Sequence, residues 1–107
     1  MRGTGIDRRQ YTRLLGIFIR ATREDLTSLR AAVSDSDADA IKHAAHHING
    51  AAEGLELGEI AYNARFIEEH VGRTDRWGEF IALCDEIDRQ LTAVSRQFGI
   101  AEWHDES

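Results

Sequence analysis

The sequence contains no proline, and few of its residues are aromatic or typical of β-strands. Aromatic side chains make up 7% of the 107 residues, and runs of valine, isoleucine and threonine are missing. Proline interrupts helices, whereas β-branched and aromatic residues favour strands. The sequence therefore predicts an all-α protein, and its length predicts a single domain.

Cysteine and long apolar runs are also scarce. Cys84 is the single cysteine, which excludes a disulfide bond within the chain. No apolar run approaches the roughly 18 residues that span a bilayer. The first ten residues, MRGTGIDRRQ, lack the apolar core of a signal peptide. We therefore expect a cytoplasmic protein without a membrane segment.

The charge balance is acidic and uneven along the chain. The formal net charge of −6 argues against general binding to nucleic acid. Residues 1–33 carry seven basic and three acidic side chains, whereas residues 34–107 carry six basic and sixteen acidic ones. This division either orients a charged partner or pairs helices within the fold. A solvent-exposed face is expected for the arginines of the first segment: Arg8, Arg9, Arg13, Arg20, Arg23 and Arg30.

Apolar residues recur at helical spacing in a long first segment and in a last one. The first pattern begins after Asp7, a good N-cap, and Gly16 is expected to break it near its start. It comprises Tyr11, Leu14, Leu15, Phe18, Thr22, Leu26, Leu29 and Val33. The last pattern, which Thr74 or Asp75 can cap and Gly99 ends, comprises Trp77, Phe80, Cys84, Ile87, Leu91, Val94 and Phe98. Cys84 is accordingly expected in the core.

Two shorter helices are predicted between these segments. Ser36 or Asp37 can cap the first of them, which ends near Gly54. The second runs from about Gly58 to His70 and stops at Gly72. Four amphipathic helices with short loops predict an antiparallel up-down-up-down four-helix bundle over residues 7–99. Residues 1–6 and 100–107 are expected to be flexible tails.

The stretch 41–58, IKHAAHHINGAAEGLELG, holds three of the five histidines. On a helical wheel its apolar residues form one stripe: Ile41, Ala44, Ala45, Ile48, Ala52 and Leu55. His46 falls on the opposite, solvent-facing side, with His43 one turn before it, Gly50 one turn after it and His47 at the flank. A glycine inside a helix costs about 1 kcal/mol relative to alanine. We therefore expect some advantage to compensate for the stability that Gly50 costs the helix.

This stretch resembles the signature of the bacterial histidine phosphotransfer (HPt) domain. That signature reads roughly A-H-x-L-K-G, followed by two small residues. Ala45, His46, Ile48 and Gly50 match its first block, and the small pair is Ala51 and Ala52. Later apolar and acidic positions are matched by Ile60, Ala64, Ile67 and Glu68. The resemblance covers roughly residues 11–98 and implies the same four-helix bundle.

The resemblance implies a phosphorelay intermediate rather than an enzyme. His46 would accept a phosphoryl group from the aspartate of a response-regulator receiver domain and pass it to another receiver. Imidazole suits this role because its neutral form is nucleophilic near pH 7. Gly50 would leave room for the docking partner. The HPt domain needs no cofactor of its own, because the receiver supplies a magnesium ion, and a hybrid histidine kinase is a further expected partner. A monomer is expected.

The sequence departs from the family signature at Asn49, where the family usually has lysine. Asn49 could donate a hydrogen bond to the phosphoryl group, but without the charge that strengthens such a bond. Around this position, His43 and His47 are expected bystanders near the phosphoryl group or the docking partner. Glu53, one turn past Gly50, would repel phosphate mildly or simply face solvent.

Two other functions fit the same residues. His43 and His47 are four residues apart, a spacing at which two helical histidines can share a zinc ion. The pattern H-E-x-x-H is absent and no further ligand lies close in sequence, so we expect no metal site. Alternatively, the chain is an HPt-like interaction module that does not transfer phosphate.

Overall fold

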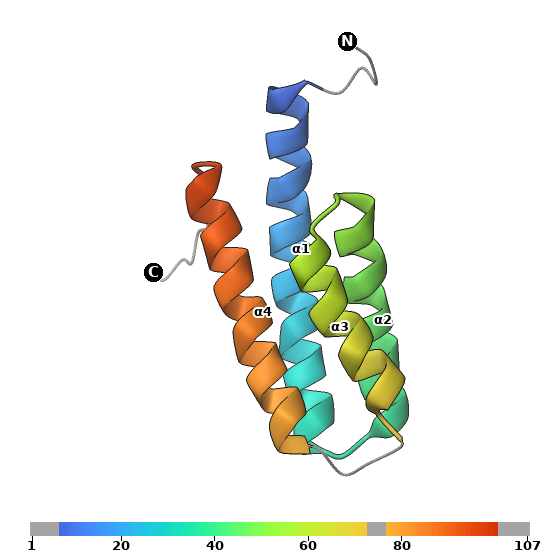
Figure 1. The fold of residues 1–107 in the computed structure, drawn as a ribbon. Coiled ribbons are helices and arrows are strands. Elements are labelled where there is room, and N and C mark those ends of the chain that lie inside the picture. The colour runs from blue at the N-terminus through green and yellow to red at the C-terminus, as the bar shows by residue number, and fades with distance from the viewer. Residues whose placement is uncertain (1–6, 73–76, 101–107) are drawn as a thin grey trace.

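The computed structural model describes residues 7–72 and 77–100, and these residues form four helices. The helices are α1 (Arg8–Ser34), α2 (Ala38–Gly54), α3 (Gly58–His70) and α4 (Trp77–Gln97). They alternate in direction, as Figure 1 shows, and α1 and α3 each pack against both α2 and α4. The predicted all-α, up-down-up-down four-helix bundle is therefore confirmed.

Side chains at the helix starts explain where α1 and α2 begin. The Asp7 carboxylate accepts a hydrogen bond from the backbone N–H of Gln10, whose side chain bonds back to the N–H of Asp7. Asp37 caps α2 by accepting from the N–H of Ala40 at 3.1 Å. Such caps satisfy backbone donors that have no partner inside the helix. Both predicted caps are confirmed, whereas the predicted caps of α4, Thr74 and Asp75, lie outside the described residues.

The turns that frame α2 are tight. Ser36, between α1 and α2, and Glu56, between α2 and α3, have positive φ angles of 53° and 62°. Gly72 and Gly99 follow α3 and α4 with φ angles of 89° and 66°, a conformation that glycine adopts at little cost. The predicted stops at these glycines are confirmed. Helix α1, in contrast, runs through Gly16 without the expected break.

The core lies along the facing stripes of the four helices. Its largest fully buried side chains include Leu15, Ile19, Leu29, Ile41, Ile48, Ile60, Ile67, Phe80, Ile87 and Leu91. Two positions in α1 differ from the predicted stripe. Leu14, which belongs to that stripe, is 41% exposed, and Ile19, which does not, is buried in the core. Ile17, off the stripe, is 61% exposed.

The core also holds Cys84 and reaches beyond α4. Cys84 is buried as predicted, and burial raises the pKa of its thiol to about 11. At neutral pH the thiol is therefore protonated and a poor nucleophile. Ile100, which the sequence placed in the C-terminal tail, packs against the core, and its N–H donates to the carbonyl of Ser95 at 2.8 Å.

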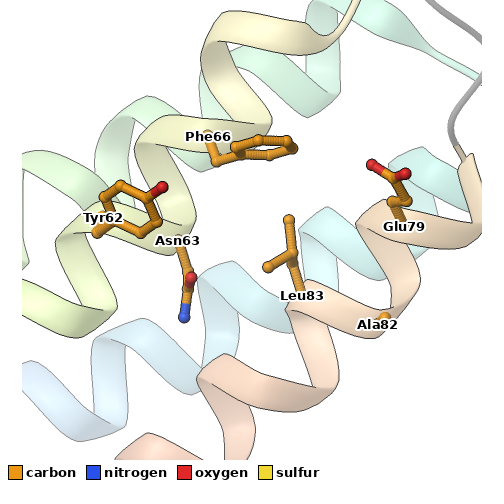
Figure 2. Close-up of a pocket in the computed structure, with 6 residues that line it drawn as sticks. All are labelled: Tyr62, Asn63, Phe66, Glu79, Ala82 and Leu83. Atoms are coloured by element: carbon orange, nitrogen blue, oxygen red, sulfur yellow. The ribbon is translucent and has the colours of Figure 1, made fainter.

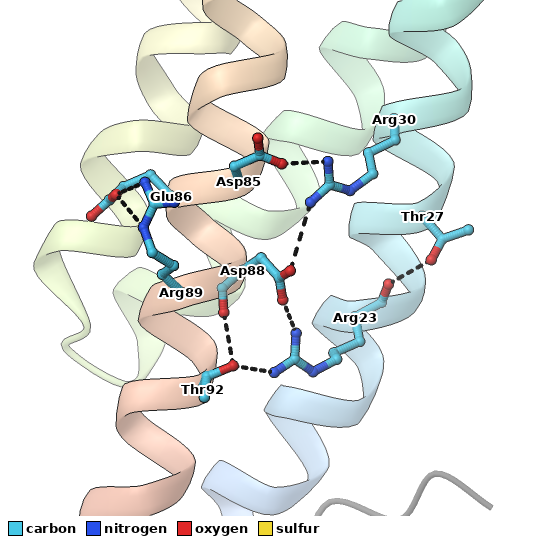
Figure 3. A network of polar contacts seen from close by, with 8 residues as sticks. All are labelled: Arg23, Thr27, Arg30, Asp85, Glu86, Asp88, Arg89 and Thr92. Carbon is cyan, nitrogen blue, oxygen red and sulfur yellow. Dashed lines mark hydrogen bonds and ion pairs between the residues drawn. The ribbon is translucent and has the colours of Figure 1, made fainter. Parts of the chain in front are cut away.

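Two of the arginines expected in solvent instead join α1 to α4, as Figure 3 shows. Arg30 pairs with Asp85 at 2.8 Å, and Arg23 pairs with Asp88 and donates to Thr92. The prediction of one solvated arginine face is therefore wrong for Arg23 and Arg30. Part of the uneven charge therefore pairs helices within the fold, which was one of the two explanations that the sequence suggested. The exposed arginines of α1 are Arg8, Arg9, Arg13 and Arg20.

In the described part of the chain, no helix combines the length and apolar character needed to cross a membrane.

Candidate functional site

Helix α2 turns one face to the core and the other to solvent. Ala44, Ala45, Ile48 and Ala52 are buried, whereas His43, His46, His47 and Gly50 are among the exposed residues of the helix. This division follows from the helical period, because apolar residues three and four apart fall on one side. The predicted orientation of the histidine face is confirmed.

His46 is exposed but held in one orientation. Its side chain is 71% exposed, and its Nδ1 lies 2.8 Å from Oε2 of Glu68 on α3. An ionised carboxylate can only accept a hydrogen bond, so in the neutral ring Nδ1 carries the proton and Nε2 carries the lone pair. Because the two nitrogens lie on opposite sides of the ring, Nε2 points away from Glu68. The site therefore offers an oriented nucleophilic nitrogen.

His47 has an equivalent arrangement on the other flank of α2. Its Nδ1 lies 2.7 Å from Oδ2 of Asp25, a residue of α1, and its side chain is 66% exposed. The carboxylate again fixes the proton on Nδ1 and leaves Nε2 free. His43 is also exposed, but it has no hydrogen bond or ion pair with the residues that the structure describes. Of the three histidines, two are therefore oriented by carboxylates.

Glu68 and Asp25 are the site residues that sequence reasoning missed. The family resemblance placed Glu68 at an acidic position but did not pair it with His46. The distances along the chain hold a usable signal, because residues equally far from a hairpin turn lie opposite each other in two antiparallel helices. Asp25 and His47 are equally far from Ser36, and His46 and Glu68 are nearly so from Glu56.

Asn49 has a partner inside the fold. It is only 8% exposed, and its side-chain N–H donates to the carbonyl of Ala61 on α3 at 2.9 Å. From the sequence, this amide could donate a hydrogen bond to the phosphoryl group. The structure instead turns it toward α3, because Asn49 lies on the side of α2 that packs against that helix. Asn49 therefore acts as a polar contact between α2 and α3.

Gly50 lies in open space on the outer face. A Cβ atom added there would meet nothing within 4 Å. A close approach by another helix of this bundle therefore does not explain the glycine. The surface beside His46 and His47 therefore carries no side chain at this position.

Glu53 is exposed, as expected, but paired. Its carboxylate lies 2.9 Å from a guanidinium nitrogen of Arg65 on α3. This pair offsets part of the negative charge near the histidine face. Both side chains of this pair are exposed to solvent, so the pair contributes at most about 1 kcal/mol to stability.

The chain's single lysine lies on the same side of α2 as His46. Lys42 comes one turn before His46 and is exposed. With Glu68 it lines a hollow of about 480 Å³, together with Glu69, His70 and Val71. Residues four apart in a helix are neighbours on its surface, so Lys42 and His46 lie next to each other on α2. Lys42 is therefore a basic group near His46 that could replace the lysine missing at position 49.

A second hollow, of about 350 Å³, lies between α3 and α4, as Figure 2 shows. Phe66 and Leu83 line it from the two helices, and Tyr62 at its edge is 67% exposed. Glu68, the partner of His46, faces α2 rather than this hollow. The hollow is therefore separate from the histidine face.

The structure also bears on the metal-binding alternative. Among residues 7–72 and 77–100, no three or more histidine, cysteine, aspartate or glutamate side chains are grouped so that they could hold a metal ion. His47, one of the two candidate ligands, already contacts Asp25 through Nδ1.

Comparison with known proteins agrees with this geometry. A family model described as Hpt domain matches residues 13–97, which include all of α2, α3 and α4 and most of α1. No curated protein and no solved structure matches the chain. Hpt domains transfer phosphoryl groups in two-component phosphorelays, where they interact with receiver domains and kinases. The match spans most of the sequence, and the chain therefore belongs to the Hpt domain family.

Proposed function

We propose that this protein relays phosphoryl groups through His46, accepting them from the aspartate of one receiver domain and passing them to another. The observation that carries the proposal is the contact between His46 Nδ1 and Glu68 at 2.8 Å, combined with the 71% exposure of the His46 side chain. The contact fixes the tautomer, and the exposure leaves Nε2 accessible to a partner.

The transfer requires one bond to form and one to break. The Nε2 lone pair attacks the phosphorus of an aspartyl phosphate, and the bond between phosphorus and the aspartate oxygen breaks. The aspartate leaves as a carboxylate, and the phosphoryl group is now bonded to Nε2. The ring becomes cationic, and Glu68 stabilises this cation while it holds the Nδ1 proton. The reverse step delivers the phosphoryl group to the next aspartate.

The surroundings of His46 support an incoming partner. Gly50 leaves open space one turn away, and the negative charge of Glu53 is paired with Arg65. Lys42 is placed to attract the phosphoryl oxygens from the side of α3. The receiver would supply a magnesium ion and most of the catalytic groups, so the protein acts as a phosphoryl carrier rather than as an enzyme. We further propose that it works as a monomer in the bacterial cytoplasm.

The proposal is tested with phosphorylated receiver domains from the same genome. The intact protein should acquire an acid-labile, base-stable label, as expected for a phosphorus–nitrogen bond. His46→Gln should abolish this label while the helical circular-dichroism spectrum stays intact, because the side chain is exposed. Glu68→Gln should slow labelling without abolishing it.

Two results would contradict the proposal. A label that survives His46→Gln at its normal rate would move the acceptor elsewhere. A protein that binds receivers but takes up no phosphate from any of them would instead be an HPt-like interaction module.

A further inference from the structure

We propose that His47 is a second phosphoryl acceptor, charged by small phosphoramidates or acyl phosphates rather than by a docked receiver. The proposal goes beyond the role of His46 and rests on the contact between His47 and Asp25. The family signature assigns no function to His47, which occupies its variable position.

The two histidines match in every feature that a nucleophilic nitrogen requires. Each Nδ1 contacts a carboxylate, at 2.8 Å for His46 and 2.7 Å for His47, and both side chains are more than half exposed. The carboxylates come from different helices, Glu68 from α3 and Asp25 from α1, and both are mostly shielded from solvent. The fold therefore builds two oriented imidazoles, not one.

The two rings cannot serve one docked partner equally. Successive residues of a helix point about 100° apart, and here one ring leans toward α3 and the other toward α1. A receiver aligned with Nε2 of His46 would cover the α2–α3 side. A small donor has no such alignment to satisfy and can reach the free Nε2 of His47 from solvent.

Phosphoramidate would transfer its phosphoryl group directly to the imidazole of His47. The Nε2 lone pair of His47 attacks phosphorus, the phosphorus–nitrogen bond of the donor breaks, and ammonia leaves with a proton from the donor or water. The Asp25 carboxylate keeps its hydrogen bond to the N–H at Nδ1 of His47 and stabilises the cationic ring that results. With an acyl phosphate the same attack releases a carboxylate. No oxidant, reductant or metal ion is consumed.

The experiment uses the full chain with His46→Gln and phosphoramidate as the probe. Phosphorus NMR should show one phosphohistidine, with the phosphoryl group on Nε2. Adding His47→Gln should remove this signal. Adding His43→Gln instead is the matched control, because His43 is exposed on the same helix face but has no carboxylate partner among the residues that the structure describes. That double variant should keep the signal.

Asp25→Asn, made in the His46→Gln protein, tests the positioning role of the carboxylate. It should slow labelling several-fold and let part of the phosphoryl group appear on Nδ1. A merely structural role of Asp25 would change the melting temperature but leave the labelled nitrogen unchanged.

Several outcomes would overturn the proposal. It fails if the His46→Gln protein takes up no phosphoryl group, or if His43→Gln removes the signal as fully as His47→Gln does. A phosphorylated receiver that charges His47 as fast as phosphoramidate would overturn the assignment to small donors. None of these results depends on whether a receiver charges His46, so the relay and the second acceptor can fail separately.

Discussion

The two flanks of helix α2 present the same chemical group in different surroundings. His46 on the α3 flank and His47 on the α1 flank are both oriented by a carboxylate at hydrogen-bond distance. Only the α3 flank adds Lys42 and the hollow that it lines with Glu68. From this comparison we infer that a carboxylate contact orients an imidazole and fixes its tautomer, whereas the groups around the ring decide which donor it can serve.

Apart from the loss of His46 itself, the largest effect is expected at Gly50, which lies between the two flanks. Gly50→Gln should keep the fold, since nothing lies within 4 Å of the added Cβ, but should obstruct a docking receiver. Transfer from the receiver should fall about 100-fold, the cost that a misplacement of about 1 Å can impose. Labelling by phosphoramidate should change little, because a small donor needs no docking surface.

Gly50→Ala provides the matched control. It should raise the stability of the fold by about 0.4–1 kcal/mol in thermal melts, because it restricts the unfolded chain. A Gly50→Gln protein that melts early, or that accepts phosphate from a receiver at the normal rate, would refute the docking account.

Matched substitutions of the two carboxylates should separate the flanks. Glu68→Gln should slow transfer from a receiver about tenfold, the lower end of the loss seen when the outer partner of a metal-bound histidine is removed. Asp25→Asn should slow the same transfer less, because it acts on the other ring. Single-turnover kinetics measure both, and equal slowing by the two variants would break the distinction between the flanks.

A smaller effect is expected for Lys42, the basic residue of the α3 flank. Lys42→Ala should slow receiver transfer to His46 by no more than about fivefold, which corresponds to the roughly 1 kcal/mol of an exposed charge pair. Lys42→Arg should retain most of the rate. Arg65→Ala removes another positive charge from the same side, and it controls for net charge. If Lys42→Ala and Arg65→Ala slowed receiver transfer equally, the position of Lys42 beside His46 would have no special effect.

The smallest effect on transfer is expected at Asn49. By analogy with the family signature, Asn49→Lys would speed transfer by restoring the usual lysine. Because Asn49 is buried against Ala61, we expect instead a loss of about 1 kcal/mol of stability from the broken hydrogen bond, with little change in rate. Thermal melts and transfer rates of the Asn49→Lys protein distinguish faster transfer from a loss of stability. Faster transfer at full stability would show that position 49 reaches the phosphoryl group.

The sequence predicts the helices well because their signals are local. Asp7 and Asp37 cap the next turn, and Gly72 and Gly99 end helices by their own backbone conformation. The outward direction of His46 also follows from local periodicity. Features of this kind depend on residues only a few positions apart.

The partners of the site depend instead on how helices align. Glu68 and Asp25 reach their histidines because of the lengths of the two turns, and Asn49 is buried because it lies on the α3 side of α2. The spacing within one helix carries no information on these contacts. The same limit explains why the sequence predicts a solvent-exposed Arg23, although Arg23 lies opposite Asp88 of α4.

The most direct test of the account identifies the phosphorylated atom after a single turnover with a phosphorylated receiver. Site mapping by mass spectrometry identifies the residue, and phosphorus NMR distinguishes the two ring nitrogens. The account predicts that the phosphoryl group is on Nε2 of His46, because Glu68 occupies Nδ1. A phosphoryl group on Nδ1 of His46, or on His43 or His47 instead, would contradict it.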